Sequence, residues 1–152
     1  MSVLQKNLSM ATNERVERTI LRSLFRNEDY FRKIIPFVKP EYYEELDEKI
    51  IFEEIQKFAS KYDRLPTTEV ILIEVEGRQD VSDETYSQVR DICVSFKDVE
   101  EDPTQDWLLD ATEKWCKDRA IYIALMESIK LADGKDEKKS RDAIPDILKE
   151  AL

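Results

Sequence analysis

Few of the residue types that usually carry catalysis occur in this chain. Its 152 residues include no histidine, which excludes Ser-His-Asp and Cys-His constellations, an imidazole general base and nearly every zinc site. The two cysteines, Cys93 and Cys116, are too few to build a metal cage. Both lie in amphipathic helical patterns, so we expect them to be reduced and buried. The sequence therefore predicts no catalytic and no metal-ligating residue.

The sequence also contains no complete P-loop motif for binding phosphates. A P-loop needs a glycine, four residues and then Gly-Lys-Ser/Thr, so that bare amides can wrap the phosphates. The single Gly-Lys pair, Gly134-Lys135, precedes Asp136 and has no glycine five residues upstream. Asp133-Gly134 instead predicts a helix C-terminus. We expect no cofactor-binding residue and no ATP hydrolysis, and abundant Asp and Glu alone do not make the chain an enzyme.

The charge of the chain is strongly negative and unevenly distributed. A net charge of −10 argues against a nucleic-acid-binding domain, because binding to phosphates needs a basic surface. Residues 41–54 hold seven acids and one lysine, and residues 98–113 hold seven acids and no base. The first 26 residues carry five Lys or Arg against two Glu. Solvated helix faces are the favoured interpretation of the acidic blocks, and electrostatic steering toward a basic partner protein is the alternative.

Composition predicts an all-α fold. Two glycines leave little material for tight turns between strands, whereas Glu, Lys, Leu and Ile favour helices. The sequence has no signal-peptide core and no apolar run of bilayer length. We therefore expect a cytoplasmic chain with no membrane partner.

Apolar spacing predicts the helices of the first hundred residues. A helix begins at Asn13, Asn27 caps a short second helix from Asp29 to Ile35, and a third runs from about Glu41 to Lys61. Ser82 caps a fifth helix. Its shared face contains Tyr86, Val89, Cys93 and Phe96. The inward face of the third helix contains Tyr43, Leu46, Ile50, Ile51, Ile55, Phe58 and Tyr62, with acids opposite.

Residues 70–75, VILIEV, are ambiguous between strand and helix. Their β-branched density would normally favour a strand. No second strand exists for such a strand to pair with, so we predict a short helix capped by Thr67.

The clearest predicted element is a helix of about 30 residues, which would be roughly 45 Å long. Asp102 is its expected N-cap, Pro103 its first residue and Gln105 part of a capping box, and no breaker follows until Gly134. A globule of about 100 residues is shorter than this helix, so the second half of the helix should project beyond it. Residues 120–126 are apolar all round, so something must cover them.

A short amphipathic helix, residues 143–152, follows the polar loop DGKDEKKS and completes an αα-hairpin. The expected organisation is a flexible arm at residues 1–12, a globular helical head at 13–101, and an assembly hairpin at 102–152. If the last helix folds back, it covers one face of the long helix but not all of residues 120–126. Trp115 is expected in the core, whereas Trp107 suits either core or interface.

Beyond these patterns, residues 14–152 resemble the N-terminal domain of the DnaB-like hexameric replicative helicases, in the form found in T-even phages. The most specific segments are Trp107-Leu108 with Thr112-Glu113-Lys114, Arg119-Ala120, and Ala143-Ile144-Pro145-Asp146-Ile147. Upstream, LFRNEDYFRKIIPFVKPEYYE, FASKYDRLPTTEVI and SDETYSQV match in order and spacing. None of these segments is a catalytic motif.

The resemblance implies an assembly function. Such N-terminal domains pair through helical hairpins into a collar above the motor ring, so the chain should form dimers or higher oligomers, and a hexamer in the full protein. Primase and helicase loader are the implied partners, in the host bacterial cytoplasm. ATP and magnesium belong to a motor domain whose linker should begin near Leu152. The expected subunit interface consists of Trp107, Ile121, Tyr122, Leu125, Met126, Ile129, Ile144, Ile147 and Leu148.

An alternative function is a free-standing acidic adaptor that docks a basic partner on its helix faces. Direct DNA binding is expected to be slight or absent. Four arginines of the first helix could touch a strand, but pairing with neighbouring acids is the favoured role. These are Arg15, Arg18, Arg22 and Arg26.

Overall fold

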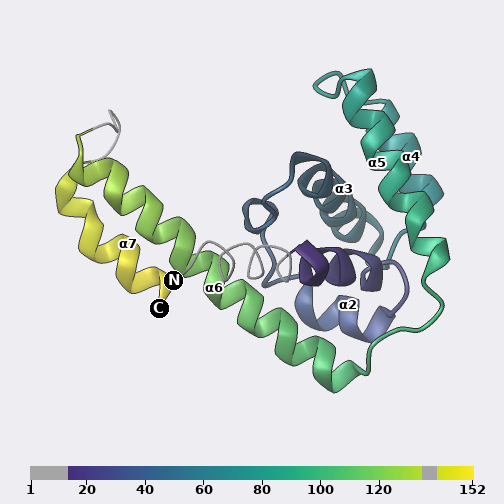
Figure 1. The fold of residues 1–152 in the computed structure, drawn as a ribbon, viewed down its shortest axis with the longest axis horizontal. Coiled ribbons are helices and arrows are strands. Elements are labelled where there is room, and N and C mark those ends of the chain that lie inside the picture. The colour runs from purple at the N-terminus through teal and green to yellow at the C-terminus, as the bar shows by residue number, and fades with distance from the viewer. Residues whose placement is uncertain (1–13, 135–139) are drawn as a thin grey trace, which may run out of the picture. The chain divides into compact units, whose positions relative to one another are not determined.

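All regular secondary structure in the described part of the chain is helical. The computed structural model describes residues 14–134 and 140–152, and neither range contains a strand (Figure 1). The predicted all-α class is therefore confirmed. The predicted arm at residues 1–12 lies outside the described residues, as do residues 135–139 of the predicted polar loop. By its contacts the chain divides into two compact units, Met1–Thr112 and Glu113–Leu152.

The first two helices form as their caps and apolar spacing predict. Residues 14–23 are helical, and the expected start at Asn13 lies outside the described residues. Helix α2, Glu28–Ile34, begins after Asn27, whose side chain accepts a hydrogen bond from the amide of Tyr30 at 3.0 Å. Acids in the first turn of α2 and bases in its last turn complement the helix dipole.

The third helix begins later than predicted. Residues Pro40–Tyr42 form a 3-10 turn, η1, and α3 spans Leu46–Tyr62. The predicted start at Glu41 is wrong because Tyr43 is extended, with φ −74° and ψ 130°. Tyr42 and Tyr43 are both buried.

The inward face of α3 is partly as predicted. Ile50, Ile51 and Ile55 are buried, but Leu46 and Tyr62 are exposed, so both were wrongly assigned. Each lies in a terminal turn of the helix, where fewer neighbours can cover a side chain. The acids are not all solvated either. Glu48 and Glu54 are buried and ion-paired, as is described below for each.

Helices α4, Thr68–Glu76, and α5, Asp83–Ser95, both pack on α3 and on each other. The helical prediction for residues 70–75 is confirmed, as is its cap: Thr67 accepts a hydrogen bond from the amide of Val70 at 3.2 Å. Ser82 caps α5 in the same way. Val89, Cys93 and Phe96 of the predicted α5 face are buried and Tyr86 is half-buried, with Phe96 opening a short 3-10 turn, η2, Phe96–Asp98.

The long helix α6 spans Gln105–Ala132, 28 residues, and runs from the first unit into the second. The predicted start at Pro103 is wrong, because the first helical hydrogen bond runs from the amide of Leu108 to the carbonyl of Thr104. Gln105 does not close a capping box. Its side chain instead donates to Asp29 and accepts from Asn27.

The end of α6 and the last helix agree with the sequence. Gly134 has φ +71°, and its amide donates to the carbonyl of Leu131 at 3.0 Å. A 3-10 turn, η3, Arg141–Ala143, precedes α7, Ile144–Ala151. Figure 1 shows α7 running beside the C-terminal half of α6 within their compact unit. Among the described residues no helix has the length and apolarity that crossing a bilayer requires.

Candidate assembly interface

Within the Glu113–Leu152 unit, α6 carries an apolar stripe that the chain leaves uncovered. Its residues recur at helical spacings of three and four, so they share one face. They are between 48 % and 54 % exposed. The stripe consists of Tyr122, Leu125, Met126 and Ile129.

A second stripe of the same unit is buried. Ala124, Ser128 and Leu131 follow one another at spacings of four and three and are all less than a tenth exposed. At 100° per residue this stripe points roughly 150° away from the exposed one. The helix therefore has apolar residues on two nearly opposite faces, and only one face is covered.

Helix α7 is amphipathic but contains no fully buried residue. Ile144, Ile147 and Leu148 are each half-buried, at spacings that place them on one face of the helix. A half-buried apolar face on a short helix leaves room for further apolar contact along its edge.

Two predicted interface residues differ from the rest. Ile121 is half-buried, at the margin of the exposed stripe. Trp107 is 50 % exposed and lies in the other unit, Met1–Thr112, so the structure does not place it with the hairpin residues. Trp115 is buried, as expected of a core residue.

Charges around the exposed stripe are held locally. The guanidinium of Arg119 lies 5.0 Å from the centre of the Tyr122 ring, a cation–π contact that fixes the ring. Lys114 pairs with Asp118, and Lys117 with Glu113, each one helical turn along α6. Both pairs lie N-terminal to the stripe, and at 100° per residue Glu113 and Lys117 point nearly opposite to it, so only the Lys114–Asp118 pair flanks the stripe.

The thiols have no reactive environment. Burial raises the pKa of Cys93 to about 11, and burial likewise raises the pKa of Cys116 to about 11. Cys93 is buried as predicted, but Cys116 is only half-buried, because it lies at the edge of the buried face that contains Trp115. In the described ranges no three His, Cys, Asp or Glu side chains converge as a metal site.

The arginines of the first helix are largely committed to acids. Arg18 lies 3.4 Å from Glu48, and Arg26 lies 2.8 Å from Asp102 and also donates to the carbonyl of Phe96. The predicted pairing is confirmed for these two. Arg22 is buried, which lowers its pKa, and Arg15 is exposed.

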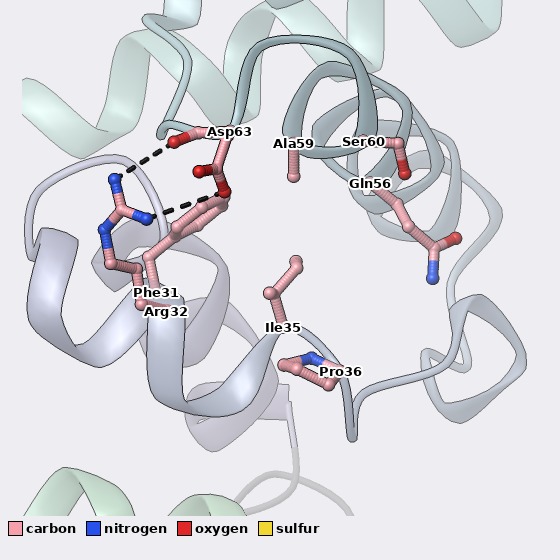
Figure 2. Close-up of a pocket in the computed structure, with 8 residues that line it drawn as sticks. All are labelled: Phe31, Arg32, Ile35, Pro36, Gln56, Ala59, Ser60 and Asp63. Atoms are coloured by element: carbon pink, nitrogen blue, oxygen red, sulfur yellow. Dashed lines mark hydrogen bonds and ion pairs between the residues drawn. The ribbon is translucent and has the colours of Figure 1, made fainter.

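An open groove of about 420 Å³ lies between α2 and α3 and was not anticipated from the sequence. Figure 2 shows Arg32 at one end, where its guanidinium reaches the carbonyl and the carboxylate of Asp63. Ile35 and Pro36 form the apolar side. No motif marks such a groove, because it arises where two helices far apart in sequence end near each other. The remaining lining residues are Phe31, Gln56, Ala59 and Ser60.

Comparison with known proteins finds one similarity in sequence. No family model matches the chain. Its sequence is similar to that of a DnaB-like replicative helicase. The relative is the DnaB-like replicative helicase of Enterobacteria phage T4, to which the chain is 30 % identical over 141 residues. The match covers 88 % of this chain and 29 % of that protein's length, so the chain spans less than a third of its relative.

Proposed function

We propose that this chain is the N-terminal assembly domain, or collar domain, of a phage replicative DNA helicase. The carrying observation is the exposed stripe of Tyr122, Leu125, Met126 and Ile129 opposite a buried stripe on the same helix. Similarity to a DnaB-like replicative helicase supports the same function. Two copies would pair through this stripe and the half-buried face of α7, Ile144, Ile147 and Leu148.

The size of the stripe fits weak pairing by the isolated chain. Covering the exposed half of four large apolar side chains is worth about 1 kcal/mol each, or roughly 8 kcal/mol for two copies. Association itself costs on the order of 4–15 kcal/mol in lost freedom. The stripe alone leaves at most about 4 kcal/mol, which corresponds to a dissociation constant on the order of 1 mM. Further apolar contact along the half-buried face of α7 would have to supply the rest for pairing at high micromolar concentration. Tethering in a hexameric ring would strengthen the contact through effective concentration.

The rest of the proposal follows from the helicase relation. ATP hydrolysis with magnesium, and translocation along DNA, would belong to a motor domain of the same protein and to none of the residues described above. The collar would also offer surfaces to primase and to the helicase loader. It would act in the cytoplasm of the infected host.

Oligomeric state tests the pairing directly. Leu125→Asp places a charge in the middle of the stripe, and we expect light scattering to show a monomer at concentrations where the unmodified chain dimerises. Ile73→Asp is the matched control, since Ile73 is equally apolar and exposed but lies on α4. Circular dichroism should remain helical for both variants. A monomeric unmodified chain at high micromolar concentration would contradict self-pairing, and unfolding of the Leu125 variant would assign the stripe to the core.

A second candidate function is a free-standing acidic adaptor. The acids of residues 98–113 favour it, because all of them are exposed. The gene discriminates between the two functions: a reading frame that continues into a P-loop motor domain contradicts the free-standing adaptor.

Direct DNA binding has little support in either function. Arg18 and Arg26 are already paired with acids, and the net charge is −10. We expect filter binding at low salt to retain no more single-stranded DNA than a neutral control protein does. Binding through release of the DNA's counterions needs Lys or Arg side chains that are not already paired with acids.

A further inference from the structure

The first two turns of α6 present a tryptophan among acids. Trp107 is 50 % exposed although it is the kind of side chain that folding normally buries. Asp106 precedes it, and Asp110 lies one turn further along the same side of the helix. Both carboxylates are exposed. We call this surface, Asp106, Trp107 and Asp110, the acidic tryptophan face.

The charge of this face is not neutralised by the fold. Among the described residues neither Asp106 nor Asp110 belongs to an ion pair, whereas Asp102 in the preceding loop is taken by Arg26. Glu100 and Glu101 of that loop are exposed and equally unpaired within the described ranges. Residues 98–113 contain no base. The tryptophan therefore lies in a negative local field.

The face is held rigidly. Leu108, next to Trp107, is almost fully buried, and Thr112 is bonded to Tyr30 of α2 within the same unit. Gln105 is fixed to Asn27 and Asp29. A side chain displayed on a pinned helix loses little conformational freedom on binding, which favours an interaction site over a mobile surface residue.

We propose that the acidic tryptophan face binds a basic segment of a partner protein, in which Lys or Arg residues flank an apolar side chain that packs on Trp107. Charge complementarity selects this occupant. A nucleic acid would be repelled, and a second copy of the chain carries the same charge of −10. An aromatic anchor surrounded by charges is the arrangement in which one residue carries much of the binding energy. The inference deepens the proposed docking of partners by a collar domain and rests on it.

The test uses a labelled peptide of alternating leucine and lysine pairs as the probe, titrated with the full chain and followed by fluorescence anisotropy. We expect Trp107→Ala and the double change Asp106→Asn with Asp110→Asn each to weaken binding about tenfold. The matched control is Glu69→Gln with Glu74→Gln, which removes two exposed acids from α4 and should change affinity less than twofold. The double Asn change preserves side-chain shape, so it remains informative if the Trp107 variant folds poorly.

Two further titrations decide the chemistry. An oligolysine peptide without leucine should bind at least tenfold more weakly than the probe, because it lacks the apolar anchor. Equal binding of the two peptides, or equal binding of the probe by the unmodified chain and the double Asn variant, would overturn the proposal. The Leu125→Asp variant should bind the probe normally. If that variant remains dimeric yet binds the probe, the pairing stripe is misassigned while the acidic tryptophan face stands.

Discussion

The hydroxyl oxygens of Tyr30 and Thr112 lie 2.6 Å apart in the buried interior of the first unit, although 82 positions separate the two residues in sequence. Thr112 also approaches the carbonyl of Leu108 at 2.7 Å and donates its only hydroxyl proton there. The Tyr30 hydroxyl is therefore the donor between the two side chains. This bond fastens the first turns of α6 to α2, beside the contacts that Gln105 makes with Asn27 and Asp29.

Removing this bond should lower the stability of the fold by an amount that depends on which partner is changed. Tyr30→Phe deletes the donor and should cost about 1 kcal/mol, the usual net value of a buried hydrogen bond. Thr112→Val takes the acceptor from a buried tyrosine hydroxyl and should cost about 1–3 kcal/mol. Urea denaturation measures both.

The conservative control is Thr112→Ser, which keeps the hydroxyl. It should lose only about 1 kcal/mol, for one methyl group. Equal losses for the Val and Ser variants would mean that packing, not the hydrogen bond, fastens the helix.

Arg78 should be the most sensitive polar residue of the α3–α5 region. Its guanidinium makes two bonds of 2.8 Å to Asp80 and reaches the buried Glu54 at 3.2 Å. Hydrogen bonding to Arg78 lowers the pKa of Asp80 to about 2. Arg78→Ala leaves a buried carboxylate with Lys57 as its remaining partner and should destabilise the fold by about 2–4 kcal/mol.

Arg78→Lys distinguishes the contribution of the positive charge from that of the guanidinium's paired hydrogen bonds. A lysine keeps the positive charge but cannot make the paired bonds, so we expect about half the loss in the same urea titration. Arg64→Ala, an exposed arginine on the adjoining loop, should change stability by less than about 0.5 kcal/mol. A loss of similar size for Arg64 and Arg78 would contradict the assignment.

The two thiols should resist modification in the folded chain. With a pKa of about 11 in each case, raised by burial, little thiolate is present at neutral pH. We expect a disulfide reagent to modify both slowly under native conditions and rapidly in urea. Half-buried Cys116 should react before buried Cys93. Fast native labelling of Cys93 would show that the α5 face opens.

Local patterns predicted the helices well because caps and spacing are properties of neighbouring residues. Asn27, Thr67 and Ser82 each cap the helix that the sequence assigned to them. The errors at Glu41 and Pro103 have another origin. Near Glu41 a 3-10 turn and the extended Tyr43 precede α3, and near Pro103 the side chain of Gln105 bonds to Asn27 and Asp29 instead of closing a capping box.

The candidate site was predictable in part. Spacing alone indicated that the long helix has more apolar residues than its own chain can cover, and the exposure of Leu125 and Met126 agrees with it. The spacing of apolar residues does not say whether a second copy of the chain covers the exposed ones, so pairing stays a prediction. Burial of Glu48 and Glu54 could not be foreseen either, because their partners Arg18 and Arg78 come from other parts of the chain.

Glu48 should make stability depend on pH near neutrality. It is 2 % exposed in the first turn of α3, with one carboxylate oxygen 3.4 Å from Arg18. Burial raises its pKa from 4.5 to about 7, against the opposing effect of Arg18, and the neighbouring Asp47 and Glu45 raise it further. Because the folded state binds the proton more tightly, the stability contribution is complete below pH 4.5 and declines as pH rises through 7.

Glu48→Gln should remove this dependence, since an amide resembles the protonated acid and cannot ionise. The shift corresponds to roughly 3 kcal/mol between the two ends of the titration. We expect urea denaturation to give the Gln variant nearly normal stability at pH 5 and a gain of about 1–3 kcal/mol at pH 8. Glu41→Gln, at an exposed position in η1, should leave the pH profile unchanged. Parallel profiles for the Glu48 variant and the unmodified chain would mean that Arg18 keeps this carboxylate ionised throughout, and that the ion pair holds the first helix against α3 at every pH.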